Sequence, residues 1–519
     1  MTQNITFFNK FFLIKYHIYK NIISCRKDFE TKPSNGQLSF SKNTVYLDTV
    51  FSGISSSTYS LKVYNKSNED LHIPTISLEK GSLSKYRLMI DGTTGTNNQG
   101  KTFHNIEILA NDSLYIFIEE TANIKDVNST DYLYTDKILF DTGINQQKVD
   151  LVTLIQDAIF LYPEKKEKLT LNDLVPNNTV YGFELNENDP INGNELHFTN
   201  TKPYVIYGYA GVPANKTLII DPGTRIYCHN QSGIFVKKSG SIKIEGTIST
   251  DQKKLEKEVI IEGDRLESKY AEIPGQWGGI YLAEGSINNN FNHLTIKNSS
   301  FGIFIDRNEE SITNIFNTQI YNSSDFGLAA RKSKINGENI VINKCGQASL
   351  ACTLGGEYRF KSCTFANYWN NSNRQIPCVY IDNTYKQKEV LFTSDLILAS
   401  FINCIIYGNN NIELGLKKND SAAFNIDFNH CLIKFNDPNN LYNNSLYNLI
   451  KNPSNNNIID TRQNNFDPKF KDPIKNNLRI LKNSPVIAKG NNSFLIPKDI
   501  DGKNRTSPPD LGAYQHLIE

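Results

Sequence analysis

The densest group of basic side chains in the repetitive part of the chain is the run of Arg331, Lys332 and Lys334. Arg307 stands near the same end of the preceding repeat. A polysaccharide lyase needs a base that removes the proton beside a uronate carboxylate, and a cation that holds that carboxylate. Lys and Arg can supply both, so these four residues are candidates for a catalytic site. The alternative is that they are ordinary solvated charges at turns, as charge runs usually are.

Carboxylates in the same part of the sequence suggest a second chemistry. Asp306 directly precedes Arg307, and Glu309 follows three residues later. Glycoside hydrolysis uses two carboxyl groups at a set separation. Asp306 is therefore a candidate for one member of such a pair, with Glu338 or Asp382 as the other, although no sequence feature fixes their distance.

A third candidate group lies where the repeat described below becomes longer. The spacing of equivalent strands stretches there to 41 residues, from Phe365 to Ile406. Insertions in repeats of this kind map to loops on one face, where aromatic rings can stack on sugars. The alternative is that the rings pack the loop against the repeats. The candidates for ligand binding are Tyr368, Trp369, Arg374, Tyr380 and Tyr385.

A repeating β-structure over residues 206–440 would position these side chains. Four similar strands have their central apolar residues at 296, 320, 342 and 365, which are 24, 22 and 23 residues apart. This spacing, with glycine at the corners between short strands, is typical of one coil of a parallel β-helix. A leucine-rich repeat would need recurring Leu-x-x-Leu-x-Leu blocks, which are absent. The predicted fold class is all-β, with a right-handed single-stranded parallel β-helix as its larger part.

Two residue types are expected to serve this scaffold. Several cysteines fall at inward strand positions without metal-binding spacing, which predicts buried packing thiols at Cys228, Cys345, Cys363, Cys404 and Cys431. Asn298 and Asn322 lie one coil apart at a turn, which predicts stacked, hydrogen-bonded amides. No metal site is predicted. Calcium is the one cofactor that the sequence raises, through Asp499-x-Asp501-Gly502, but the glutamate that closes such a loop is missing.

Residues 37–165 show short alternating runs punctuated by Asn and Gly, such as Tyr59–Tyr64 and Ser113–Glu119. Strands of this length with frequent turns predict an N-terminal antiparallel β-sandwich. We predict no site within it. Residues 166–205 are rich in Asn, Asp, Pro and Gly, and are predicted to connect the sandwich to the first coil and to cap that coil.

The N-terminus has features of an exported lipoprotein. Residues 1–24 are apolar and aromatic, though lysines interrupt them, and Ile22–Cys25 resembles the lipobox of bacterial lipoproteins. The charged and polar stretch 25–36 would then be a tether. Acylation of Cys25 would give the chain its only membrane anchor, which predicts a cell-envelope, outer-membrane lipoprotein. The alternative is an amphipathic N-terminus that is not a signal.

The C-terminal residues 441–519 resemble the ending of many bacterial β-helix proteins. The resemblance rests on Asn483–Gly490 and on Asp499–Arg505 followed by Asp510–Gln515, and is of the choice-of-anchor type. With the lipobox and the sandwich, it makes the chain similar to Bacteroidetes surface lipoproteins that join an immunoglobulin-like domain to a pectate-lyase-like β-helix. The resemblance implies a C-terminal cap over otherwise unpaired strand edges. It names no activity.

The charge balance removes one class of partner. Lys plus Arg number 55 and Asp plus Glu number 54, a formal charge of +1, so no attraction to nucleic acid is predicted. Two functions remain open. The favoured one is a structural or glycan-binding lipoprotein of the cell envelope. The other is a carbohydrate-active enzyme on an acidic polysaccharide, a lyase rather than a glycoside hydrolase.

Overall fold

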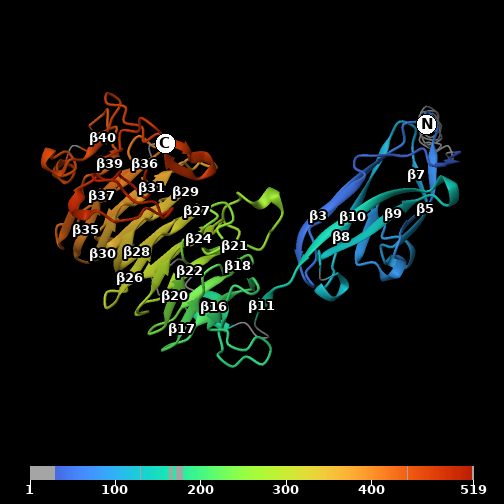
Figure 1. Ribbon diagram of the computed structural model, residues 1–519, viewed down its shortest axis with the longest axis horizontal. Helices are drawn as coiled ribbons and strands as arrows, with labels where there is room; N and C mark the ends of the chain where they lie inside the picture. Colours follow the sequence, from blue (N-terminus) through green and yellow to red (C-terminus); the bar gives the residue numbers. More distant parts are fainter. Residues whose placement is uncertain are drawn as a thin grey trace, which may run out of the picture. The chain divides into compact units, whose positions relative to one another are not determined.

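The computed structural model describes residues 30–128, 130–162, 167–170, 179–387, 389–440, 442 and 444–516. The predicted signal segment 1–24 and the predicted lipidation residue, Cys25, lie outside them. The chain divides into two compact units, Met1–Gln156 and Asp157–Glu519, and both are built mainly from β-strands (Figure 1). Among the residues just given, no helix is long and apolar enough to cross a membrane.

The first unit contains two β-sheets. The four-stranded sheet is antiparallel and has the order β2 (Ser39–Phe40), β4 (Tyr59–Tyr64), β8 (Ser113–Glu120) and β6 (Tyr86–Ile90). The six-stranded sheet has the order β1 (Lys32–Pro33), β5 (Leu71–Leu78), β9 (Leu133–Phe140), β10 (Gln147–Gln156) and β3 (Thr44–Phe51), with β7 (Thr102–Ile108) paired to β5. Short 3-10 helices lie in the loops: η1 (Gly81–Leu83), η2 (Thr96–Asn98), η3 (Ile124–Asp126) and η4 (Gly143–Asn145).

The prediction of an antiparallel sandwich is correct only in part, because the six-stranded sheet is mixed. In it β1 runs parallel to β5, and β3 runs parallel to β10. Parallel neighbours need a long connection between them, and almost the whole unit lies between β3 and β10 in the sequence. Alternation along the strands directs one side of each sheet into a shared core that includes Val45, Leu61 and Ile116.

The predicted tether 25–36 is partly incorporated into this unit. Lys32–Pro33 pairs with β5, and the buried hydroxyl of Ser34 donates to the carboxylate of Asp141. The N–H of Gly36 donates to the other oxygen of the same carboxylate at 2.9 Å. The structure therefore places Lys32–Pro33 in the sheet and holds residues 34–36 against it, because their polar groups have specific partners there.

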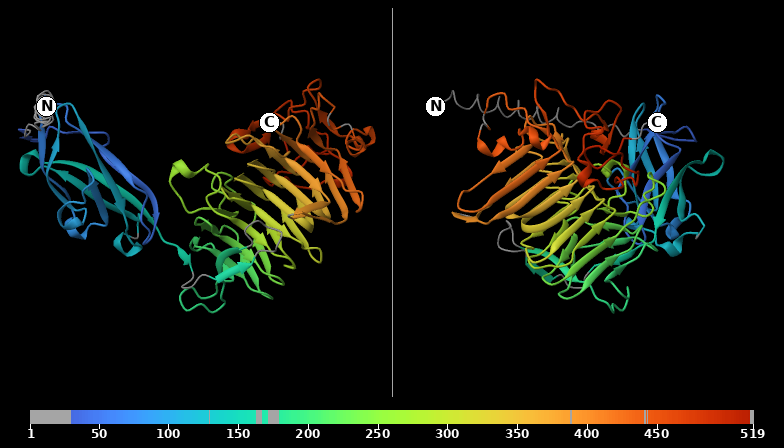
Figure 2. Two further views of the ribbon diagram at one scale, coloured as in Figure 1. Left: turned by 180° about the vertical axis from the view of Figure 1, so that it is seen from behind. Right: turned by 60° about the vertical axis from the view of Figure 1, so that its left-hand side comes forward.

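The second unit is formed mainly by two large parallel sheets, whose strands stack coil on coil (Figure 2). The eleven-stranded sheet comprises β11 (Ile159–Leu161), β15 (Tyr204–Ile206), β18 (Arg225–Cys228), β21 (Val259–Gly263), β24 (Leu294–Lys297), β27 (Gln319–Ser323), β29 (Val341–Cys345), β31 (Thr364–Asn367), β36 (Ile405–Gly408), β39 (Leu432–Lys434) and β40 (Ile458–Asp460).

The seventeen-stranded sheet supplies the other two sides of the coils. It comprises β12 (Glu167–Thr170), β13 (Thr179–Glu184), β14 (His197–Phe198), β16 (Tyr209–Val212), β17 (Thr217–Ile220), β19 (Gly233–Val236), β20 (Ser241–Glu245), β22 (Gly279–Leu282), β23 (Asn290–Asn292), β25 (Ile303–Asp306), β26 (Ile312–Phe316), β28 (Leu328–Glu338), β30 (Leu350–Lys361), β32 (Val379–Asp382), β35 (Leu396–Ile402), β37 (Leu414–Lys417) and β38 (Phe424–Asn429). Its strands are parallel except β12, which runs antiparallel to β13.

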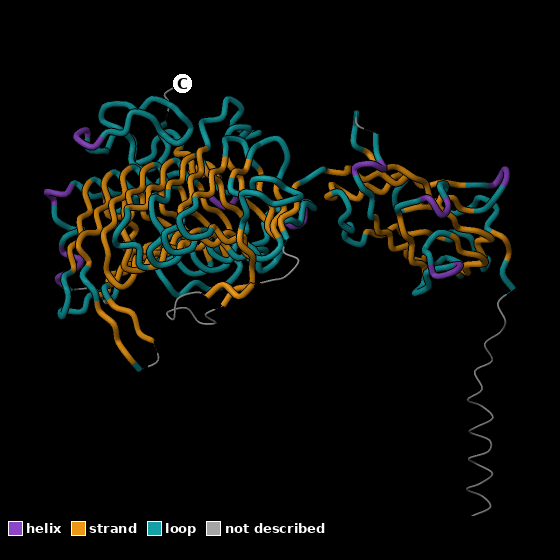
Figure 3. Tube along the Cα trace, turned by 90° about the horizontal axis from the view of Figure 1, so that it is seen from below, coloured by secondary structure: helices purple, strands orange, loops and turns teal. Residues whose placement is uncertain are grey.

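Smaller elements complete this unit. The hairpin of β33 (Thr384–Gln387) and β34 (Val390–Thr393) extends away from the coils (Figure 3). A second antiparallel pair near the C-terminus joins β41 (Phe470–Asp472) to β42 (Asn477–Ile480). The 3-10 helices are η5 (Ser268–Tyr270), η6 (Ser445–Asn448), η7 (Pro453–Asn455), η8 (Pro473–Lys475) and η9 (Asn492–Phe494).

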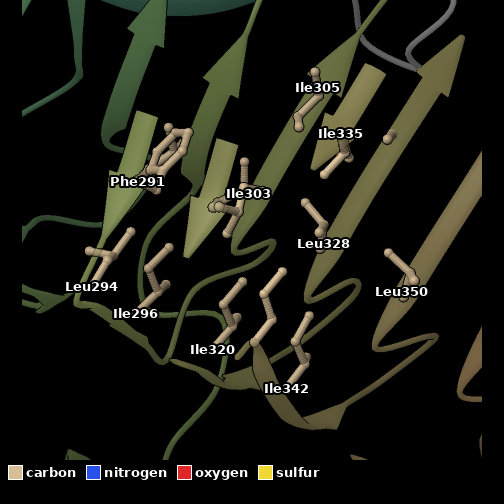
Figure 4. Close-up of a cluster of buried hydrophobic side chains, with 14 of the residues drawn as sticks. Phe291, Leu294, Ile296, Ile303, Ile305, Ile320, Leu328, Ile335, Ile342 and Leu350 are labelled. Atoms are coloured by element: carbon tan, nitrogen blue, oxygen red, sulfur yellow. The ribbon is translucent and has the colours of Figure 1, made fainter. Parts of the chain in front are cut away.

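The strand alignment expected from the repeat spacing is confirmed. Ile296 pairs with Ile320, Ile320 with Ile342, and Ile342 with Phe365. Their side chains are fully buried, and the three isoleucines lie side by side inside the coils (Figure 4). Each coil therefore buries its apolar residues against its neighbours rather than alone.

The predicted roles of cysteine and asparagine are confirmed too. The five predicted cysteines are free and buried in this core, together with Cys352 and Cys378. The amide of Asn322 donates to the side-chain oxygen of Asn298 at 3.1 Å, and Asn476 continues the row by donating to Asn322 at 3.3 Å. Amides at this turn thus bond to one another across coils.

The boundaries of the second unit differ from the predicted ones. Ile159–Leu161, assigned to the sandwich, pairs with Tyr204–Ile206 in the coil sheet, so the change between units falls at residue 156. Tyr447 and Ile450 pack at the end of the coil core. Residues 461–516, predicted to cap that end, instead pack along the eleven-stranded sheet. The outer side of this sheet is apolar and is covered by residues including Leu478, Val486, Leu511 and Tyr514.

Candidate functional site

The two uncovered sides of the coils carry the predicted site residues. We call the outer side of β19, β22, β25, β32 and the N-terminal halves of β28 and β30 the aromatic face. The outer side of β20, β23, β26 and the C-terminal halves of β28 and β30 is the groove face. Both long strands bend between the faces, where their pairing shifts register at Arg331–Ser333.

The predicted basic cluster forms only in part, and carboxylates neutralise most of its members. Arg307 and Arg331 both lie within 4 Å of Oδ1 of Asp306, at 3.8 and 3.0 Å. Strand pairing puts Arg331 beside Asp306 rather than beside Arg307. The Nη2 atom of Arg307 lies 2.9 Å from Glu284, and Nζ of Lys332 lies 3.2 Å from Glu309. Only Lys334, beyond the bend, lacks a partner among the described residues.

Arg331 is held in a stack of rings on the aromatic face. Its guanidinium lies 4.9 Å from the ring centroid of Phe304 and 5.2 Å from that of Tyr385. Behind Phe304, the rings of Tyr281 and Phe235 continue the stack at centroid distances of 5.2 and 5.0 Å. Tyr385 comes from the β33–β34 hairpin, so the stack attaches this hairpin to the coils.

Asp306 lies beneath this stack and is fully buried. Its Oδ1 atom accepts from Nε of Arg331 at 3.2 Å and lies 3.0 Å from Nη2, and its Oδ2 atom accepts from the hydroxyl of Tyr281 at 3.0 Å. Burial raises the pKa of Asp306, and the positive charge of Arg331 opposes that shift. A carboxylate enclosed by protein donors holds the structure together and is closed to a substrate.

The other carboxylates do not join Asp306. Asp382 lies three strand spacings away, about 14 Å along the sheet, which exceeds the separations used in glycoside hydrolysis. Its Oδ1 atom accepts from the N–H of Leu354 at 3.0 Å, and burial raises its pKa. Glu338 stands at the far end of β28 and pairs with Lys361 at 3.3 Å.

The predicted aromatic group is divided by the structure. Tyr380 and Tyr385 lie on the aromatic face. Trp369 is buried and donates from Nε1 to Ser372 at 2.9 Å, and Arg374 forms a buried pair with Glu413 at 2.5 Å. Tyr368 packs edge-on against Phe470, with ring centroids 6.2 Å apart. These last three candidates pack the lengthened loop against the protein.

A groove of about 420 Å³ opens on the groove face. Lys334 is its one lining residue that the sequence analysis named as a site candidate. Strand pairing aligns Asn314 with Asn336 and Asn336 with Arg359, so polar side chains follow one another at about 4.8 Å per strand. The half-exposed side chain of Ile312 adds an apolar patch. The lining residues are Ile312, Asn314, Lys334, Ile335, Asn336, Glu357, Arg359 and Lys361.

The polar groups of the groove differ in their partners. Arg359 pairs with Glu357, and Lys361 pairs with Glu338. Within the described part of the chain, Nζ of Lys334 and the side-chain amides of Asn314 and Asn336 have no protein partner. The groove therefore offers an uncompensated positive charge and amides that can both donate and accept hydrogen bonds.

Sequence reasoning missed the asparagines of the groove, although a signal was present. Asn290, Asn314 and Asn336 recur 24 and 22 residues apart, the same period as the buried isoleucines. Pairing confirms that they are aligned on neighbouring strands. The repeat spacing could therefore have predicted that these asparagines align on neighbouring strands. Whether their side chains have hydrogen-bond partners can be seen only in the three-dimensional structure.

The calcium-like loop is occupied by the protein's own donors. The carboxylate of Asp499 accepts from the N–H groups of Lys503 and Gln515 at 2.7 and 2.9 Å, and Asp501 forms a two-bond pair with Arg479. Arg505, in the same segment, donates to Asn339 at 2.8 Å. In the described ranges, no three His, Cys, Asp or Glu side chains are grouped so as to hold a metal ion.

Comparisons with known proteins do not identify a family. No family model and no curated protein matches the chain. Among solved structures, the catalytic domain of a GH87 alpha-1,3-glucanase in complex with tetrasaccharides matches at 12% identity, over 74% of this chain and 80% of that chain, with a TM-score of 0.20.

Two further structures match smaller parts. The PapD-like domain 7 of human CEP192 matches at 13% identity over 26% of this chain and 96% of its own length, with a TM-score of 0.15. A family 123 glycoside hydrolase from Clostridium perfringens matches at 10% identity over 24% of this chain and 30% of its own, also at 0.15. Likenesses of this size carry no argument about activity.

Proposed function

We propose that the second unit is a glycan-binding scaffold whose groove face binds an acidic polysaccharide along the stacked coils. We also propose that the coils form the right-handed single-stranded parallel β-helix expected from the sequence. The observation that carries the functional proposal is that three polar residues of the groove, Lys334, Asn314 and Asn336, have side chains without a partner among the residues that the structure describes. Sugar hydroxyls match amides, and a uronate or sulfate group matches the free ammonium.

The aromatic face supports this choice by contrast. Its charged residues, Asp306 and Arg331, are buried against each other and against rings, so a ligand would have to displace existing bonds. The groove face needs no such displacement. A periodic polymer also suits a surface whose polar groups recur once per strand.

Binding of the full chain to polygalacturonate, with dextran as the neutral comparison, tests the proposal. We expect Asn314→Ala with Asn336→Ala to weaken binding about tenfold, and Lys334→Ala about fivefold. Lys332→Ala is the matched control, because it removes the same charge from the same strand outside the groove. Dextran binding that falls as much as polygalacturonate binding in the double asparagine variant, or equal losses in the control, would contradict the proposal.

An acidic-polysaccharide lyase is the second candidate, favoured by the unpaired Lys334 amine beside two further cations in the groove. The same incubations are followed by ultraviolet absorbance for unsaturated products and by an assay for new reducing ends. Unsaturated products that disappear in Lys334→Ala would establish a lyase. Binding without either product supports the scaffold.

We further propose that acylation of Cys25 anchors the chain in the cell envelope, as the lipobox-like residues suggest. In expressing cells, the chain is expected in the membrane pellet, and Cys25→Ser is expected to release it. Cys228→Ser serves as a control, because Cys228 is buried in the coil core. A Cys25→Ser chain that stays in the pellet would contradict the anchor.

A further inference from the structure

The four-stranded sheet of the first unit presents exposed rings on its outer side. Along β8, alternation turns Tyr115 and Phe117 outward, with 48% and 38% of their side chains exposed. Their ring centroids are 6.3 Å apart and their planes differ by 18°. Met89, 39% exposed, stands opposite Phe117 on β6. Nζ of Lys62, opposite Tyr115 on β4, lies 5.2 Å from the Tyr115 ring centroid, so the apolar surface is centred on Phe117. This surface lies on a sheet that was predicted to carry no site.

A pocket of about 180 Å³ opens beside Phe117. It forms because the loop 93–100 lies against β6, the edge strand, and the N–H of Leu88 donates to the carbonyl of Gly100 at 2.9 Å. Gly100 has a φ of +67°, and a Cβ there would lie 2.8 Å from the carbonyl oxygen of Leu88. A side chain at this position would push the loop away from the strand. Glycine therefore allows the loop to lie against β6 and form one wall of the pocket.

The pocket wall opposite Phe117 is polar but carries balanced charge. Arg87 and Glu119 face each other across β6 and β8 with 3.5 Å between Nη2 and Oε2, and Thr58 donates to Glu119 at 2.6 Å. Asn98 and Gln99 come from the loop. Among the residues that the structure describes, the Gln99 amide and the Nδ2 atom of Asn98 have no partner.

We propose that this pocket binds one pyranose unit of a neutral glycan. The ring of Phe117, which lines the pocket, covers the apolar C–H face of the sugar. The amides of Asn98 and Gln99 and the Arg87–Glu119 pair take its hydroxyls, since together they offer both donors and acceptors. The paired charges exclude a preference for an anionic sugar, which separates this site from the groove of the second unit.

An apolar protein surface would be the other occupant of exposed rings, but it suits the pocket less well. Covering the pocket with apolar atoms would leave the free amides and the Arg87–Glu119 pair without water. A sugar replaces that water with hydroxyl groups. The site also stands independently of the proposed function, because it lies in the other unit and takes a neutral ligand.

Affinity gel electrophoresis of the full chain tests the site, with hydroxyethylcellulose, galactomannan, soluble starch or dextran in the gel. The native chain is expected to be retarded by at least one of them, with little change when salt is raised, since the two charged side chains that line the pocket are paired with each other. Phe117→Ala is expected to weaken this retardation about tenfold, and Gln99→Ala about threefold. Far-ultraviolet circular dichroism checks that each variant folds.

Two controls give the result its meaning. Tyr46→Ala removes another exposed tyrosine, 66% exposed, from the six-stranded sheet and is expected to leave retardation unchanged. Lys334→Ala is also expected to leave it unchanged, so failure here and failure of the groove are separate results. No retardation by any of the four polymers, an unaffected Phe117→Ala variant, or concentration-dependent self-association that Phe117→Ala abolishes would overturn the proposal.

Discussion

The aromatic face and the groove face are two neighbouring outer sides of the coils, and both belong to the seventeen-stranded sheet. They share the strands β28 and β30, yet the polar residues on the two faces differ in whether they have protein partners. On the aromatic face, Arg331 is enclosed by Asp306, Phe304 and Tyr385. On the groove face, Lys334 and Asn336 are partly exposed, and their side chains have no partner within the described ranges. The difference shows that a polar residue on a coil becomes a candidate for binding only when the neighbouring coils leave it unsatisfied.

The largest expected effect comes from breaking the pair on the aromatic face. Arg331→Ala should destabilise the second unit by about 3 kcal/mol, because it removes the nearer of two cations beside the buried carboxylate of Asp306 and leaves only Arg307, whose Nε lies 3.8 Å away. Urea unfolding followed by tryptophan fluorescence measures this, since both tryptophans, Trp277 and Trp369, belong to that unit. A loss below about 1 kcal/mol would mean that Arg331 is free to act on a ligand.

A buried carboxyl in the first unit extends the comparison to pH. Both side-chain oxygens of Glu120 are buried, and burial raises its pKa from 4.5 to about 7, although the backbone N–H of Ala122 and the charge of Arg87 oppose the shift. Because the pKa of Glu120 is higher in the folded state, its neutral carboxyl supports folding fully below pH 4.5. This contribution to the free energy of unfolding is lost as pH rises through 7, by about 3 kcal/mol in total.

Hydrogen exchange in β6 and β8 at pH 5 and pH 8, corrected for intrinsic rates, measures that loss. Glu120→Gln should remove the pH dependence, because glutamine stays neutral at both values. A native unit that is equally protected at both pH values would show that Glu120 is stabilised by a partner or is not buried.

A third prediction compares two asparagines on consecutive strands, β28 and β29, which belong to different sheets of the coils. Asn343 is buried, donates to Pro473 and Asn476 at 2.8 and 2.9 Å, and accepts from the N–H of Tyr368 at 3.0 Å. Asn343→Ala should therefore cost about 2 kcal/mol of unfolding free energy, whereas Asn336→Ala should change it by less than about 0.5 kcal/mol. Equal costs in urea unfolding would remove the distinction between structural and available asparagines.

Much of the scaffold could be predicted, because the apolar positions of a coil are set by a short, strict period. Ile296, Ile320 and Ile342 repeat every 22 to 24 residues, and stacking of the coils then follows. The mixed sheet of the first unit could not be predicted, since the pairing of β3 with β10 joins distant segments and depends on the whole unit.

The site was less predictable for a related reason. One residue of register decides whether Arg331 meets Arg307 or Asp306, and strand pairing chooses Asp306. The C-terminal segment likewise covers an outward sheet instead of the coil end, because that sheet is apolar on its outer side. Both outcomes depend on contacts between segments that sequence spacing describes only approximately.

The central claim is that the groove face, and not the aromatic face, receives an acidic glycan. Hydrogen–deuterium exchange of the full chain with and without a galacturonate hexamer tests it most directly. We predict added protection in Ile312–Phe316 and in the C-terminal halves of β28 and β30, with no change in Ile303–Asp306 or Val379–Asp382, and loss of the effect in the Asn314→Ala, Asn336→Ala double variant. Protection on the aromatic face, or none at any hexamer concentration, would contradict the account.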